Sequence, residues 1–210
     1  MKKKYFLNAN IVDPHNSIEE IGGLIVSEEG KIEAIGKKVN KNNIPSREKF
    51  IDLKEKYIFP GLVDMRVHIT EPGLEHKETI KSASKAAASS GITSLICMPN
   101  TTPPIDQPAI IHSIQRKARE VALSKVFCTG CITRGAYGKE ICELQLMNES
   151  GALAFTDGNK SVANARVMKR ALNYAKSFNG LIIQHPEEPE LSKGGVCNEG
   201  ETATRMGLKG

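Results

Sequence analysis

The sequence has few cysteines, no long apolar run and no leader-like start, and each absence excludes a class of protein. Its five cysteines are too few, and odd in number, for a disulfide framework, so we expect reduced thiols. Apolar runs such as 92–98 and 181–183 fall far short of the ~20 residues that a membrane span needs. Residues 1–4 are basic, but polar residues within 8–13 interrupt the apolar core that a signal peptide requires. We therefore expect a cytoplasmic protein without a membrane segment.

Two further functions are disfavoured by what is missing. The net charge is +5, but the lysines are scattered and no basic stripe alternates with aromatic residues, so nucleic-acid binding is not expected. Cys128 and Cys131 form a C-x-x-C pair within the strand-like run 126–132. Residues three apart on a strand face opposite ways, so these thiols should diverge rather than form a redox or zinc pair.

Residues 1–58 predict a small all-β domain. Tyr5–Val12 is a mixed apolar strand, and 23–26 and 31–35 flank a turn, which predicts a hairpin. Further strands are expected at 50–53 and 57–59. We interpret 1–58 as the N-terminal part of a small β-sandwich module.

From Pro60 onward, strands alternate with helices. Strands are expected at 62–69 (a buried strand), 93–98, 126–132, 152–155 and 181–184. Helices are expected at 77–90, 109–122, 139–149, 162–178 and from 198 to 206. This α/β pattern predicts a parallel sheet, either doubly wound or part of a (β/α)8 barrel. No G-x-G-x-x-G follows the first strand, which argues against a dinucleotide-binding fold.

The ends of these strands carry the polar groups on which chemistry would depend. In parallel α/β folds, reactive residues collect at the carboxyl ends of the strands. His68 and His185 both stand at such ends, and Asn100 follows the second strand. Two histidines at one end of a barrel suggest a metal site, whereas each alone would suit a structural role. Both interpretations stay open on the residues alone.

Longer motifs resemble a known family. PGLVDMRVH at 60–68 is similar to the first barrel strand of the amidohydrolase superfamily, P-G-x-x-D-x-H-x-H. EPGLEHKE at 71–78 and CMPNTTPPID at 97–106 resemble segments of type I dihydroorotases. Similar motifs continue, in family order, at 130–133, 154–157 and 198–201. The resemblance covers nearly the whole chain, and it implies that 59–210 form the first five βα units of an amidohydrolase (TIM-type) barrel.

The resemblance also implies a function and a site. Members interconvert dihydroorotate and N-carbamoyl-aspartate in pyrimidine biosynthesis, with zinc that activates water and polarises the amide carbonyl. It places His68 and His185 at metal-ligand positions and Asn100 at a contact with the substrate carboxylate. No catalytic residue is assigned within these 210 residues, because the family's catalytic aspartate lies further along the chain.

Three positions depart from the family pattern. Arg66 replaces the first histidine of H-x-H, and a guanidinium cannot lose its proton to bind a metal. Gly158 replaces the second aspartate of T-D-D-G, although Asp157 would cover it if the loop shifted register. Thr70 replaces the arginine that holds the substrate carboxylate. We therefore expect zinc to be weakly bound or absent and the activity to be impaired.

These losses leave three functional hypotheses. The first is an impaired homologue with a structural or regulatory role, for example as a partner of aspartate carbamoyltransferase. The second is an active zinc dihydroorotase with a rearranged site, completed by residues beyond 210. The third is a hydantoinase- or allantoinase-like enzyme, because Thr70 would suit a substrate that lacks a carboxylate.

A complete barrel needs ~200–250 residues, more than 59–210 provide. An open half-barrel would leave bare sheet edges and an uncovered apolar interior. We therefore expect either a fragment of a longer product or a truncated homo-oligomer that hides those edges, and we favour the fragment.

Overall fold

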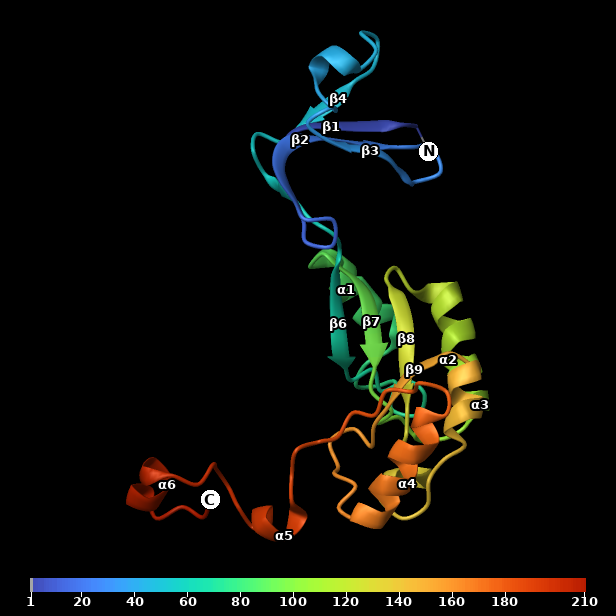
Figure 1. Cartoon of the computed structure of the whole chain (residues 1–210), viewed down its shortest axis with the longest axis vertical. Coiled ribbons are helices and arrows are strands. Elements are labelled where there is room, and N and C mark those ends of the chain that lie inside the picture. The colour runs from blue at the N-terminus through green and yellow to red at the C-terminus, as the bar shows by residue number, and fades with distance from the viewer. Residues whose placement is uncertain (1) are drawn as a thin grey trace. The chain divides into compact units, whose positions relative to one another are not determined.

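The computed structural model describes residues 2–210, and the chain divides into two compact units, Met1–Gly61 and Leu62–Gly210. The first unit holds one five-stranded sheet with the order β3-β2-β1-β4, in which β5 also pairs with β1 (Figure 1). Its strands are β1 (Lys4–Asp13), β2 (Ile18–Val26), β3 (Ile32–Gly36), β4 (Phe50–Asp52) and β5 (Tyr57–Ile58), with a 3₁₀ turn at Lys41–Asn43.

Alternating residues of β1 form the core of this unit. Tyr5, Leu7, Ala9 and Ile11 are buried, the spacing of two that places side chains on one face of a strand. The expected hairpin is confirmed, because β2 and β3 pair antiparallel. The described strands lie in a single sheet, so the second layer of the expected sandwich is not among residues 2–61.

The second unit is an α/β structure around a parallel sheet with the order β6-β7-β8-β9 (Figure 1). Its strands are β6 (Leu62–Val67), β7 (Ile92–Cys97), β8 (Lys125–Gly130) and β9 (Ala152–Phe155). Its helices are α1 (Ile80–Ser89), α2 (Pro108–Val121), α3 (Leu144–Glu149), α4 (Ala165–Lys176), α5 (Pro189–Ser192) and α6 (Glu201–Met206). The alternation of strands and helices expected after Pro60 is confirmed. None of the helices within 2–210 combines the length and apolar character of a membrane crossing.

Helices α1, α2 and α3 each pack beside one strand, β7, β8 and β9 respectively. Helix α2 shows why: Ile110, Ile111, Ile114 and Ala118 recur at helical spacing and are all buried. They join one hydrophobic core with buried residues of the sheet. The helices thus anchor the strands, and the loops that follow the strands remain free to carry polar groups.

Two strand predictions need correction. The first barrel strand was expected to be buried, but Val63 and Met65 of β6 are 57% and 71% exposed. Val63 and Met65 are two residues apart, so they share one face of the sheet, and no described element covers that face. The expected strand 181–184 is reduced to a bridge between Ile182 and Phe155, because the chain adds only two backbone hydrogen bonds to β9 there.

Four helices, α1, α3, α4 and α6, begin three to five residues later than expected, and α3 and α4 show why. Residues 139–143 do not extend α3, because Ile141 forms a bridge with Thr133 and the Cys142 amide donates to the Ile132 carbonyl. Helix α4 begins at Ala165, where the Asn164 side chain accepts hydrogen bonds from the first free amides of the helix.

Candidate functional site

The candidate site lies where the strands of the second unit end. Because β6 to β9 are parallel, the loops that follow them leave the same edge of the sheet. His68 comes directly after β6, Asn100 lies in the loop after β7, and Gly158 lies in the loop after β9. His185 follows the bridge at Ile182.

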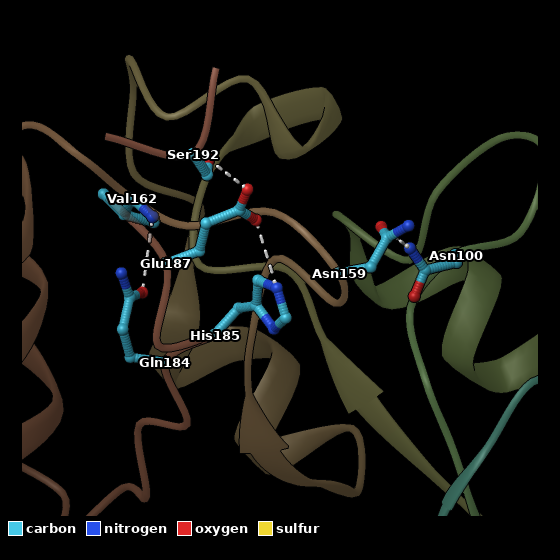
Figure 2. Close-up of polar contacts among 7 residues, drawn as sticks. All are labelled: Asn100, Asn159, Val162, Gln184, His185, Glu187 and Ser192. Carbon is cyan, nitrogen blue, oxygen red and sulfur yellow. Dashed lines mark hydrogen bonds and ion pairs between the residues drawn. The ribbon is translucent and has the colours of Figure 1, made fainter. Parts of the chain in front are cut away.

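The Asn100 amide fills the space beside Gly158. Its Nδ2 donates to Oδ1 of Asn159 at 3.0 Å, as Figure 2 shows, which links the loops after β7 and β9. Its Oδ1 is buried and has no hydrogen-bond partner among the described residues. Gly158 has a φ of +73°, and a Cβ built there would lie only 2.2 Å from this oxygen. The amide therefore occupies the volume that a carboxylate at position 158 would need.

Asp157 does not replace the missing carboxylate. Its side chain is 2% exposed, and its Oδ1 accepts the backbone amides of Ile132 and Thr133, each at 2.9 Å. Its Oδ2 accepts the hydroxyl of Thr133. Burial raises the pKa of the Asp157 carboxyl, although the hydrogen bonds from Thr133 and Ile132 oppose that shift. Both oxygens thus tie the loop after β9 to the end of β8.

His185 is held by an acidic neighbour. Its Nε2 lies 3.2 Å from Oε2 of Glu187, whose other oxygen accepts the Ser192 hydroxyl at 2.6 Å (Figure 2). Its Nδ1 is buried and has no partner among residues 2–210. Nearby, Oε1 of Gln184 accepts the Val162 amide at 3.3 Å. A carboxylate on one ring nitrogen, with the other nitrogen bare, is the usual arrangement of a metal-binding histidine.

In the described part of the chain, residues of β6 and the loop after it form no comparable histidine–carboxylate contact. Arg66 and His68 are exposed, and no side-chain hydrogen bond or ion pair of either occurs among the described residues. The Thr70 hydroxyl faces its own loop, 3.0 Å from the Leu74 carbonyl and 3.2 Å from that of Glu78. Thr70 therefore closes the loop after β6 instead of reaching a ligand.

These residues do not make up a zinc site by themselves. Within 2–210, no three His, Cys, Asp or Glu side chains are grouped closely enough to hold a metal ion. Zinc sites usually take at least three protein ligands. Here Arg66 brings a fixed charge, and the Asn100 amide fills the place beside Gly158. The donor set thus lacks two of the positions that the motif pattern would provide.

Two residues of this region, Tyr137 and Lys160, belong to none of the motifs found in the sequence. Tyr137 and Lys160 line a pocket of about 260 Å³ together with Asn100 and Asp157. The Lys160 Nζ lies 5.6 Å from the centre of the Tyr137 ring, within cation–π range. Both follow strand ends, β8 and β9, and that position is the only signal by which the sequence marks them.

The cysteines take no part in a reactive pair. Four are buried, namely Cys97, Cys128, Cys131 and Cys142, while Cys197 is exposed, and all are free thiols. Burial raises the pKa of Cys128 and of Cys142 to about 12, which leaves almost no thiolate at neutral pH. The C-x-x-C pair belongs to the hydrophobic core.

Comparison with known proteins gives consistent matches. A family model described as "Dihydro-orotase-like" matches residues 55–210. The dihydroorotase of Caldicellulosiruptor saccharolyticus is 42% identical over 204 residues, which are 97% of this chain and 46% of that protein. The dihydroorotase of Aquifex aeolicus is 38% identical over 208 residues, 99% of this chain and 48% of that protein. The chain thus spans about half the length of the curated relatives it matches.

Solved structures support the fold. An L-hydantoinase from Arthrobacter aurescens superposes with a TM-score of 0.69 at 22% identity, over 87% of this chain and 40% of that one. A dihydroorotase crystal structure gives a TM-score of 0.56 at 15% identity, over 87% of this chain and 50% of the other. At these identities the likeness concerns the fold alone, and it confirms a partial amidohydrolase barrel.

Proposed function

This chain belongs to the dihydroorotase family of the amidohydrolase superfamily, and we propose that it is a catalytically impaired member. One observation carries the proposal: position 158 has no carboxylate, and the Asn100 amide fills the space that a Cβ there would need. Arg66, in place of the first histidine of H-x-H, supports it because a guanidinium repels a cation.

The proposed substrate class is that of the relatives. Proteins named dihydroorotase match almost the whole chain, so the ligand would be dihydroorotate or N-carbamoyl-aspartate, and Asn100 would contact its carboxylate. His68 and His185 are the proposed remaining ligand positions for zinc, which would be held weakly or not at all. The proposed setting is pyrimidine biosynthesis in the cytoplasm.

We further propose a structural or regulatory role in an assembly. Exposed apolar residues on β6, including Val63 and Met65, support a surface that another polypeptide covers. The proposed partners are a second copy of this chain and aspartate carbamoyltransferase. In domain terms, 1–58 would be the N-terminal part of a β-sandwich, and 59–210 the first five βα units of the barrel.

An active enzyme is the second candidate, and His185 favours it. Its Nδ1 is bare while Glu187 holds its Nε2, so residues beyond 210 would only have to bring further ligands. In that case His185→Ala would abolish turnover, as would His68→Ala.

Metal content and turnover decide between the two candidates. We expect purified protein, measured by inductively coupled plasma mass spectrometry, to hold far less than one zinc per chain and to leave dihydroorotate unchanged. We expect the triple variant Arg66→His, Gly158→Asp and Asn100→Ala to take up more zinc than Arg66→His alone, since it restores a second donor and removes the amide that fills its space. Stoichiometric zinc together with turnover in the unaltered protein would overturn the proposal that the protein is catalytically impaired. A pull-down with aspartate carbamoyltransferase tests the proposed partner separately.

A further inference from the structure

The pocket beside Asn100 is built by three loops. Residues 99–104 after β7, 135–137 after β8 and 157–160 after β9 all contribute to its lining. Two contacts cross between the loops: the amide of Asn100 to Asn159, and the ammonium of Lys160 over the Tyr137 ring. At about 260 Å³, the pocket is slightly smaller than the ~300–1,000 Å³ of drug-sized sites, which suits a small metabolite.

The pocket lining carries one carboxylate, Asp157, and one ammonium, Lys160, and the charge of Lys160 favours the ionised form of the Asp157 carboxyl. Asp157 directs both carboxylate oxygens to the end of β8, where Ile132 and Thr133 donate to them. Lys160 is the only lysine or arginine in the lining, and none of the ion pairs found within residues 2–210 involves it. The pocket therefore presents one cation without a bonded carboxylate, next to an amide.

We propose that this pocket binds the carboxylate of a small molecule through Lys160, in place of the arginine that Thr70 has replaced. An ammonium is a compact point charge with three donors, so it can hold a carboxylate without the fixed geometry that a guanidinium demands. The Lys160 ammonium lies 5.6 Å from the centre of the Tyr137 ring, which lines the same pocket. The proposed contact needs no metal, because an ammonium binds a carboxylate directly.

The inference rests on the proposed function only for the choice of probe. The probe is dihydroorotate, and the control ligand is dihydrouracil, which has the same ring without the carboxylate. Titration calorimetry on the 210-residue chain, with a chelator present, measures the affinity for each. We expect dihydroorotate to bind about 10- to 100-fold more tightly than dihydrouracil, as a charge-assisted contact implies.

Two lysine variants locate the contact. Lys160→Gln removes the charge and should reduce the preference for dihydroorotate to about twofold or less. Lys139→Gln is the matched control, since Lys139 is an exposed lysine near the same loops that does not line the pocket. It should keep the full preference. Tyr137→Phe keeps the ring and should behave as the unaltered protein, whereas Tyr137→Leu should weaken the preference severalfold.

Three results would overturn the inference: equal affinity for the two probes, no measurable binding of dihydroorotate, or an equal loss from Lys160→Gln and Lys139→Gln. Circular dichroism of each variant separates a lost contact from a lost fold. The outcome is independent of the impaired assignment. Zinc content and turnover test that assignment, whereas this experiment excludes free metal and follows binding alone.

Discussion

At the scale of single residues, Gly158 and Asn100 behave as one steric unit. The sequence shows that a family carboxylate is missing at position 158, but it gives no sign of what takes the space. The structure places the Asn100 amide there, with Oδ1 buried and unpartnered. A buried carbonyl oxygen without a donor costs free energy, so this packing is tolerated rather than optimal.

Substituting Gly158 tests this packing. Gly158→Ala should destabilise the fold through its positive φ, by ~1–2 kcal/mol, and further through the contact with Asn100, by ~1 kcal/mol or more. Gly138→Ala is the control, since φ there is +71° and nothing lies within 4 Å of the added Cβ. Urea unfolding of Gly158→Ala and Gly138→Ala, each alone and combined with Asn100→Ala, measures the interaction free energy between each glycine position and Asn100. Equal costs at the two glycines would contradict the steric account.

Asp157 should give stability a particular dependence on pH. Burial raises its folded pKa above the ordinary value of 3.8, so the folded state holds this proton more tightly than the unfolded state. The contribution is therefore complete below the ordinary pKa and is lost as the pH rises through the folded value. We expect the free energy of unfolding to fall, relative to Asp157→Asn, as the pH rises from about 4 toward neutrality.

Urea unfolding at several pH values, for both proteins, measures this difference. The variant keeps an oxygen that can accept the amides of Ile132 and Thr133, and it removes the charge. Glu120→Gln, at an exposed position on α2, controls for the loss of a carboxylate elsewhere. Parallel pH profiles for Asp157→Asn and the unaltered protein would count against the burial argument.

At the scale of elements, side-chain caps fix the first residues of α1 and α4. Helix α1 was expected from 77 but begins at Ile80, because Thr79 accepts from the Ser82 amide while Ser82 accepts from that of Thr79. Oε2 of Glu71 also accepts the Ile80 amide at 2.8 Å. Periodicity locates such a helix, whereas its first residue is decided by these side chains.

Removing the Thr79 cap should lower the free energy of unfolding by a measurable amount. Thr79→Ala should lower the free energy of unfolding by ~1 kcal/mol, because it leaves the Ser82 amide without its acceptor. Lys85→Ala, at an exposed position of the same helix, should change it by less than ~0.5 kcal/mol. Denaturant titrations of the two variants provide the comparison. Similar values for both would mean that the cap contributes nothing.

At the scale of the whole molecule, the second unit carries an open sheet edge. The buried residues gather between the helices and β7 to β9, whereas β6 exposes Leu62, Val63 and Met65. Edge strands with exposed apolar side chains favour association. The chain spans about half the length of the relatives it matches.

A charge on β6 should therefore reduce self-association. Met65 is 71% exposed, so Met65→Lys should leave the free energy of unfolding within ~0.5 kcal/mol of the original. Sedimentation velocity over a range of concentrations should show less association for this variant. Leu123→Lys, at a residue 72% exposed after α2, should have no such effect. Unchanged association in Met65→Lys would show that β6 is not the contact surface.

The sequence by itself determined the family, the alternation of strands and helices, and the three altered positions Arg66, Gly158 and Thr70. These follow from local pattern, because side-chain period and motif spacing are properties of neighbouring residues. Only the tertiary structure decided what fills the altered site, since the contact of Asn100 with Gly158 and that of Lys160 with Tyr137 join residues of different loops. The exposure of β6 was likewise decided by what covers the faces of its sheet, and no pattern within the strand records that.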